Sequence, residues 1–282
     1  MNSPIAPGAT SRRVGSARIT VQLVTFFAVT FLIAWAAWIP LFRNRSLPSQ
    51  IAFLGLFAPA LAALSIATVW GGRRGVRDIV RRVTILNFPL RWALLSALIM
   101  PTIYLAAIAA IRVLKLGGTQ PLFAGNSPIF IAVGFVWLVF ITSGEELGWR
   151  GYALPRLLEC THRVILVSLG LGVIWGLWHL PLYLLPGQSA FPFPLFVIFT
   201  ALQSILYTVV FLKTRGSLLP ALLLHAGTDI APRIFQLARL PAAFWVIVDF
   251  SLAVAVAVLV IGMRGQLSAA EQWRSEILAV SE

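Results

Sequence analysis

Apolar residues dominate this chain in long runs, separated by short stretches rich in Arg, Gly and Pro. A helix rising about 1.5 Å per residue needs about twenty residues to cross the roughly 30 Å hydrocarbon core of a bilayer, and each run approaches that length. The pattern therefore predicts an all-α, polytopic membrane protein, a helical bundle of about eight transmembrane helices. The runs lie near 20–42, 50–70, 92–112, 128–149, 164–185, 193–212, 217–235 and 243–263.

No internal repeat or change of composition divides the chain, so we expect one membrane domain over residues 19–264. Residues 1–18 are rich in Ser, Gly, Pro and Arg and predict a disordered cytoplasmic tail. Residues 265–282 are expected to form a short cytoplasmic C-terminal tail. The first apolar run reaches Phe42, longer than the apolar part of a signal peptide, which favours an uncleaved anchor. The basic stretch from Arg73 to Arg82 fits either a short surface helix or a charged loop.

The charge balance identifies the partners that we expect. Hydrophobic residues make up 59% of the chain and charged residues only 11%, with a net charge of +13. In a soluble protein this charge favours nucleic acid. Here the cations lie between apolar runs, where they set orientation and attract anionic headgroups. We therefore expect membrane lipid as a partner and no nucleic acid.

The same cations predict the orientation in the membrane. The N-terminus, the 71–91, 150–163 and 213–216 connections and the C-terminal tail hold sixteen Lys and Arg residues, against six on the opposite side. This excess predicts an integral protein of the cell (plasma or inner) membrane with both termini in the cytoplasm. Cys160 is the only cysteine, which excludes an internal disulfide and a thiolate metal cluster.

A few ionisable residues interrupt the apolar runs, and they are the candidates for chemistry. A charge at the bilayer centre costs roughly 2.5–3.5 kcal/mol on insertion scales, so such residues must face one another or water. Asp249 has no evident partner and is assigned a structural role. The others are Glu145, Glu146, His179, His225 and Asp229.

Each local pattern also has a purely structural interpretation. Glu146 and Arg150 are four residues apart and can pair on one helical face, which leaves Glu145 for a different task. Alone, however, two adjacent glutamates are typical of a solvated helix end. Gly144 and Gly148 permit close helix packing or a bend.

His179, in the stretch Trp175-Gly-Leu-Trp-His179, is by itself typical of a packing histidine, and its tryptophans fit helix packing. His225 and Asp229 share a helical face. They can ligate a metal, hold a tautomer or supply hydrogen bonds to a reacting oxygen. They can equally be a buried pair that joins two helices.

Three of these patterns are Glu145-Glu146 with Arg150, Trp175 with His179, and His225 with Asp229. Together they resemble the motifs of the CPBP group, the CAAX proteases and bacteriocin-processing enzymes also called the Abi family, which includes the type II CAAX prenyl endopeptidase. That group is marked by Glu-Glu-x-x-x-Arg, Phe-x-x-x-His and His-x-x-x-Asn or Asp, in this order on separate membrane helices. The resemblance covers about residues 128–235. Two positions depart from the prenyl endopeptidases: Trp175 replaces Phe, and Asp229 stands where they have Asn.

The resemblance implies an intramembrane endopeptidase that cleaves a membrane-associated, CAAX-like or other, peptide or lipid-modified protein. Glu145 would be the general base that activates a water, and His179 would position that water. His225 and Asp229 would stabilise the oxyanion or hold the site together, with Glu146 and Arg150 in support. The mechanism stays open between a glutamate-dependent and a metalloprotease route, because Glu145, His179, His225 and Asp229 are also donors that zinc accepts.

Two other functions remain as alternatives. A non-catalytic member of the same family would act in bacteriocin self-immunity or as a membrane scaffold. A small-solute transporter is disfavoured, because the chain holds no repeat and no matching pair of interrupted helices.

The depths of two candidate residues disagree with a simple bundle. A helix starting at Val164 places His179 about 22 Å from the cytoplasmic edge, whereas Glu145 lies near the end of its run. For the two to meet, we expect a long or tilted fourth helix, a kink near Gly144, or a partly embedded 150–163 connection.

Overall fold

The computed structural model describes residues 7–44, 47–48, 50–117, 125–161, 163–184, 191–237 and 240–263. These residues form helices and, within the described ranges, no β-strand. The helices are α1 (Pro7–Arg43), α2 (Ile51–Leu56), α3 (Ala58–Arg81), α4 (Leu90–Val113), α5 (Pro128–Gly148), α6 (Leu154–Cys160), α7 (Val164–Trp178), α8 (Leu180–Tyr183), α9 (Phe193–Lys213), α10 (Leu219–Phe235) and α11 (Ala242–Gly262).

The prediction of a polytopic helical bundle is confirmed. Among the described residues, five helical segments are long and apolar enough to cross a membrane: Ala17–Leu41, Leu90–Val113, Pro128–Cys160, Phe193–Lys213 and Ala242–Gly262. Every other apolar run is also helical, but none of them meets both criteria. The run 50–70 is broken between α2 and α3. In the run 164–185, α7 has only 15 residues, and in the run 217–235, α10 carries polar side chains. The count of eight spans therefore stays a prediction.

The structure decides two points that composition left to expectation. α1 begins at Pro7, so much of the segment 1–18 expected to be disordered is helical, because extending an existing helix is easier than starting one. The basic stretch Arg73–Arg82 is also helical through Arg81, after a kink at Gly72, whose φ of 58° suits glycine. Residues 1–6 and the 265–282 tail lie outside the described residues.

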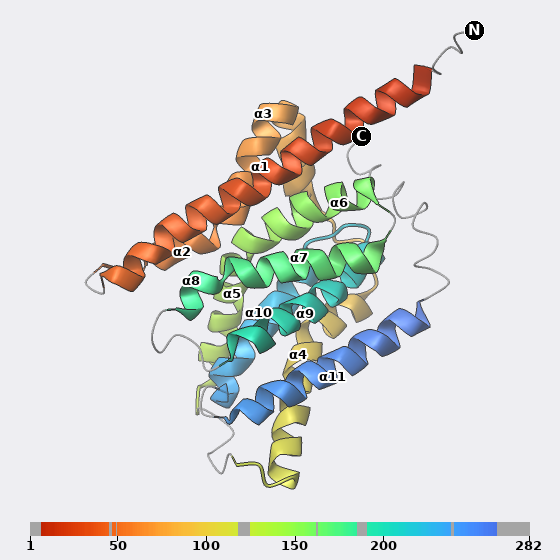
Figure 1. Ribbon diagram of the computed structural model, residues 1–282. Coiled ribbons are helices and arrows are strands. Elements are labelled where there is room, and N and C mark those ends of the chain that lie inside the picture. The colour runs from red at the N-terminus through yellow and green to blue at the C-terminus, as the bar shows by residue number, and fades with distance from the viewer. Residues whose placement is uncertain are drawn as a thin grey trace.

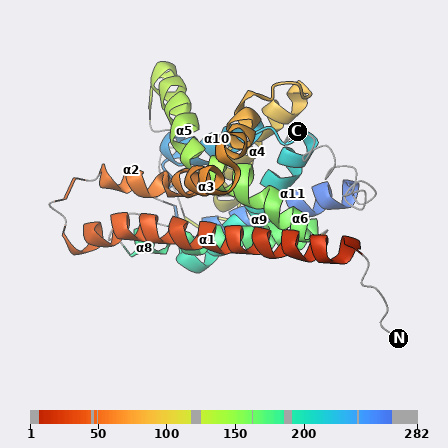
Figure 2. The same ribbon diagram turned by 90° about the horizontal axis from the view of Figure 1, so that it is seen from above.

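α9 is the central helix of the bundle. It packs against α7 on one side and α11 on another, while α10 lies between α4 and α5. Figures 1 and 2 show α1 crossing the outside of the molecule, along α2, α3 and α6. The segments with the motifs, α5 to α6, α7 and α10, therefore enclose one region next to α9.

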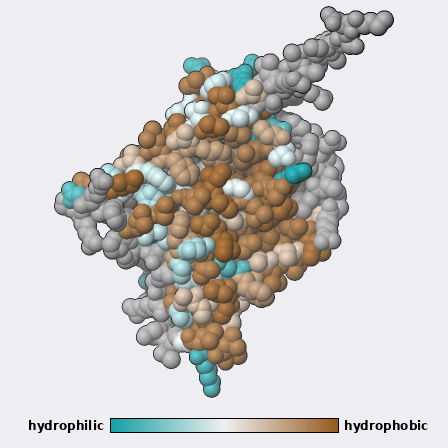
Figure 3. All heavy atoms as spheres, viewed as in Figure 1, coloured by the Kyte–Doolittle hydropathy of each residue, from teal (hydrophilic) through white to brown (hydrophobic). Residues whose placement is uncertain are grey.

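The outer surface is largely apolar. The face in Figure 3 is covered over its middle by hydrophobic residues, with hydrophilic ones in small patches. Exposed apolar side chains recur at helical spacing on one face of α5 and one of α11, as expected for helices in contact with lipid. On these faces lie Ile129, Phe130, Val133, Val136, Trp137, Phe140, Val246, Phe250, Val254, Val258 and Ile261.

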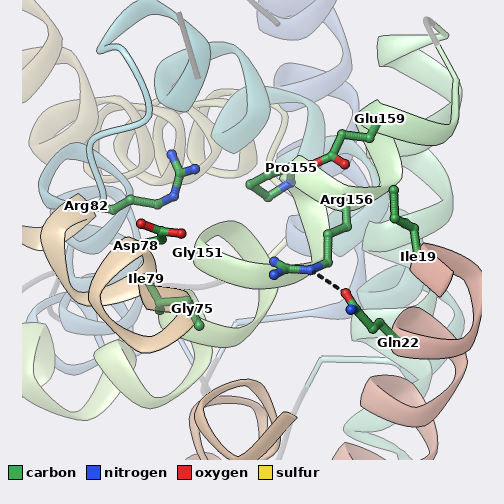
Figure 4. A pocket seen from close by; sticks show the side chains of 10 residues that line it. All are labelled: Ile19, Gln22, Gly75, Asp78, Ile79, Arg82, Gly151, Pro155, Arg156 and Glu159. Atoms are coloured by element: carbon green, nitrogen blue, oxygen red, sulfur yellow. Dashed lines mark hydrogen bonds between the residues drawn. The ribbon is translucent and has the colours of Figure 1, made fainter. Parts of the chain in front are cut away.

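A polar cavity of about 140 Å³ lies between α1, α3 and α6 (Figure 4). Two basic and two acidic residues line it, so their charges balance: Arg82, Arg156, Asp78 and Glu159. Arg156 Nε donates a hydrogen bond of 3.2 Å to Gln22 Oε1. Burial lowers the pKa of Arg82 to about 10, while Asp78 opposes the change. None of the candidate site residues lines this cavity.

Candidate active site

The first motif lies where α5 passes into α6. α5 ends at Gly148, and a π-helical turn, Trp149–Ala153, leads directly into α6. The apolar segment Pro128–Cys160 is therefore one continuous helical span of 33 residues. The long fourth helix expected from the sequence is present, and it takes in most of the 150–163 connection. Such π-helical turns often occur at functional sites.

This long span explains how Glu145 and His179 reach the same depth. Glu145 lies fifteen residues before Cys160, where α6 ends, and His179 lies fifteen residues after Val164, where α7 begins. α6 and α7 lie side by side and are joined by a short link (Figure 1). At about 1.5 Å per residue, both side chains are about 22 Å from that link.

Glu146 is held from two sides. Its Oε1 accepts hydrogen bonds from Arg150 Nη1 at 3.0 Å and from His225 Nδ1 at 2.9 Å. All three side chains are buried, and a buried charge needs partners of this kind. The expected Glu146–Arg150 ion pair is therefore confirmed, and it also ties α10 to the α5–α6 span.

Glu145 faces α7 instead. Its Oε2 accepts a hydrogen bond of 2.6 Å from the indole Nε1 of Trp175. The same oxygen lies 4.0 Å from His179 Nε2. Adjacent glutamates on one helix thus point at different helices, because successive residues are about 100° apart around the axis.

The tautomer of His179 follows from its second contact. Its Nδ1 lies 2.9 Å from the carbonyl oxygen of Trp175, one helical turn earlier. A carbonyl oxygen only accepts, so Nδ1 carries the proton and the neutral ring presents an unprotonated Nε2. This nitrogen is the one that faces Glu145.

His225 lies between two carboxylates. Its Nδ1 donates to Glu146, and its Nε2 lies 3.9 Å from Asp229 Oδ2, one turn further along α10. The side chain of Asp229 is 40% exposed, whereas that of Glu145 is 5% exposed. Asp229 therefore marks the open side of the site.

Aromatic rings surround these groups. The Arg150 guanidinium lies 4.6 Å from the centroid of the Trp175 ring and 4.0 Å from that of Tyr207. Trp175 also meets His225 edge to face, with ring centroids 5.4 Å apart. These contacts orient the guanidinium toward Glu146 and restrict rotation of the indole.

The residues do not form a metal site in this arrangement. Across the described ranges, no three His, Cys, Asp or Glu side chains gather closely enough to hold an ion. Glu145 with His179 and His225 with Asp229 form two separate pairs, and zinc in proteins is normally held by three or four protein ligands. The four donors that composition alone allowed for zinc therefore do not fit a zinc centre.

Sequence reasoning named six residues of this region but missed the role of two others. The sequence indicates only a packing role for Trp175, and it gives Tyr207 no role. The available signals were weak: a Trp where the family motif has Phe, and a phenol inside the apolar run 193–212. Neither reveals a hydrogen bond to a residue 30 positions away.

Comparisons with known proteins agree with the motifs. Residues 127–231 match the family model described as "Type II CAAX prenyl endopeptidase Rce1-like". The chain is also similar to "CAAX prenyl protease 2" of Methanococcus maripaludis, with 26% identity over 224 residues that cover 71% of this chain and 80% of that protein. Glu145, His179, His225 and Asp229 all lie within the matched region.

Proposed function

We propose that this chain, which is similar to the Rce1-like type II CAAX prenyl endopeptidases, is an intramembrane endopeptidase in which Glu145 activates a water. The water attacks the carbonyl carbon of a peptide bond in a membrane-associated substrate. Glu145, His179, His225 and Asp229 carry the reaction, and Glu146 and Arg150 support it.

One observation carries this proposal: the 4.0 Å between Glu145 Oε2 and His179 Nε2. That separation is too long for a direct hydrogen bond. It suits one water between them, because two hydrogen bonds of about 2.8 Å bring their acceptors about 4 Å apart when the angle at the water is about 90°. Both atoms accept, so the water donates one hydrogen to each and directs a lone pair outward.

The reaction then follows general acid–base chemistry. Glu145 takes a proton from the water while the water oxygen bonds to the carbonyl carbon. The product is a tetrahedral intermediate with the negative charge on the former carbonyl oxygen. When the C–N bond breaks, Glu145 returns the proton to the leaving amine. His179 keeps the water in line, since its Nδ1 proton is held by the Trp175 carbonyl.

His225 and Asp229 act on the carbonyl oxygen of the scissile bond. Because Nδ1 of His225 donates to Glu146, the ring can donate to an oxyanion only from a protonated Nε2. In that form its charge is balanced by Glu146 and Asp229. Without that second proton, the pair orients the peptide instead.

The substrate class is taken from the named relative, a CAAX prenyl protease. We propose a peptide or protein with a C-terminal CAAX-like sequence and a lipid tail that partitions into the bilayer. The apolar outer faces of the helices suit such a tail, and the exposed Asp229 suits a peptide arriving beside it.

The test is cleavage of a fluorogenic prenylated CAAX peptide by the purified protein in nanodiscs. Glu145→Gln should lower kcat by about 10²- to 10⁴-fold, the usual contribution of a general base. Glu159→Gln changes another carboxylate of the same helical span, in the cavity of Figure 4, and should keep wild-type activity.

A chelator should leave the wild-type rate unchanged, because the donors do not gather into a metal site. If the chelator abolished activity and added zinc restored it, a metal-dependent mechanism would replace the metal-free one. Full activity of Glu145→Gln would end the proposal for this site.

A further inference from the structure

We propose that Trp175 is a positioning residue of the active site and that its indole N–H sets the direction in which Glu145 accepts the water. This inference rests on the proposed function. It assigns a role to a residue whose type, by itself, indicates only packing.

The hydrogen bond between the two residues is short and shielded from solvent. Trp175 Nε1 lies 2.6 Å from Glu145 Oε2, and the two residues are 3% and 4% exposed. Hydrogen bonds to an ionised acceptor are shorter and stronger than neutral ones, and exclusion of water strengthens them further. The bond therefore keeps the carboxylate in one rotamer.

The bond also selects which part of the carboxylate remains available. A carboxylate oxygen has two main acceptor directions, and the indole occupies one of them on Oε2. The other is left for the proposed water, which would also reach His179 Nε2, 4.0 Å from Oε2. Trp175 thus points the lone pair of the base toward the histidine.

The same residue orients the second partner of the water. Its carbonyl oxygen accepts from Nδ1 of His179 and so determines which ring nitrogen faces Glu145. Side chain and main chain of Trp175 therefore act on the two groups that hold the nucleophile.

The indole is itself held in place. The Arg150 guanidinium lies over its ring at 4.6 Å, and Tyr207 meets it edge to face, with centroids 5.7 Å apart. On α7, Gly176 leaves room for α9, because a Cβ there would lie 2.5 Å from Thr200 Oγ1. A donor fixed before the reaction does not need to reorganise during it.

A variant that removes only the N–H separates this role from packing. Trp175 is replaced by β-(3-benzothienyl)alanine, which keeps the bicyclic shape but has sulfur in place of the N–H. We expect kcat to fall about 10- to 100-fold with KM within twofold of wild type and an unchanged melting temperature. Trp175→Phe should lower kcat at least as much.

Trp178 supplies the matched control. It lies on the same helix and is fully buried, and its Nε1 has no hydrogen-bond partner among the described residues. The same replacement at Trp178 should leave kcat within twofold of wild type. Wild-type kcat in the Trp175 isostere, with Glu145→Gln inactive, would overturn the inference and leave the proposed function standing.

A second readout does not depend on activity. In protein labelled with ¹⁵N-tryptophan, the indole N–H signal of Trp175 is assigned by its loss in Trp175→Phe. The chemical shift of its proton should lie downfield of that of an indole without a hydrogen bond, and it should move upfield in Glu145→Ala. The Trp178 signal should stay in place. If the chemical shift of the Trp175 indole proton were the same in Glu145→Ala as in wild type, the inference would be overturned even if no substrate were cleaved.

Discussion

At the scale of single residues, two adjacent glutamates have opposite surroundings. Oε1 of Glu146 accepts hydrogen bonds from both Arg150 and His225, and the charge of Glu146 is balanced inside the protein. Glu145 has an indole donor and a histidine nitrogen 4.0 Å away, and among the described residues no Lys or Arg side chain pairs with it. The first arrangement is typical of a structural charge, and the second of a group left able to accept a proton.

This difference predicts opposite effects of the two isosteric changes on stability. Glu146→Gln leaves the buried Arg150 without its counter-charge, and breaking a buried pair from one side costs about 3–5 kcal/mol. We expect a clearly lowered melting temperature in detergent. Glu145→Gln removes a buried carboxylate with no such partner and should melt at or above the wild-type temperature. Equal melting temperatures for the two variants would contradict the division of roles.

At the scale of helices, close packing against the α5–α6 span positions the first motif. Gly148 lies against the backbone of Pro59 at the start of α3, where a Cβ would come within 2.5 Å of the proline carbonyl carbon. Gly144 meets the α2–α3 junction in the same way, because a Cβ there would lie 2.8 Å from the Leu56 carbonyl oxygen. The two glycines act through close packing, one of the two roles expected of them.

Gly148→Ala should therefore destabilise the protein, although alanine is the better helix former. Overpacking against backbone costs about 1–3 kcal/mol, more than the roughly 1 kcal/mol gained in helix propensity. Gly170→Ala on α7 is the matched control, because a Cβ at Gly170 meets nothing within 4 Å. We expect a lower melting temperature for the first variant and an equal or higher one for the second. The reverse order would refute the packing argument.

At the scale of the whole molecule, the apolar outer faces and the cation distribution describe a protein oriented in a bilayer. The link between α6 and α7 and the end of α11 lie toward the right of Figure 1, while α8 and the start of α11 lie toward the left. The α6–α7 link and the tail that follows α11 belong to the connections richer in Lys and Arg. We propose that this end faces the cytoplasm.

The single cysteine offers a direct test of that orientation. Cys160 is exposed and ends α6, on the proposed cytoplasmic side. A membrane-impermeant maleimide should label it in inside-out vesicles but not in intact cells. In a Cys160→Ser background, Leu114→Cys, at an exposed position after α4, should give the opposite pattern. Labelling of Cys160 from outside intact cells would reverse the topology.

The helices and their approximate limits were predictable from the sequence, because the length of an apolar run and the i,i+4 spacing are local properties. The apolar pattern located helical segments of the described residues and, with the i,i+4 spacing, the Glu146–Arg150 pair. It ended the fourth run at residue 149, since the charged 150–163 segment resembled a loop. The side chains of Arg150 and Tyr152 are in fact buried.

What only the tertiary structure decided is which side chains meet across helices. Glu146 bonds to His225, 79 residues away, and Glu145 bonds to Trp175, 30 residues away. These contacts depend on the rotation and depth of each helix, which small residues such as Gly148 and the π-helical turn control. Sequence spacing specifies the face of one helix, but the partner of that face is set by how the helices pack, and packing is a property of the whole bundle.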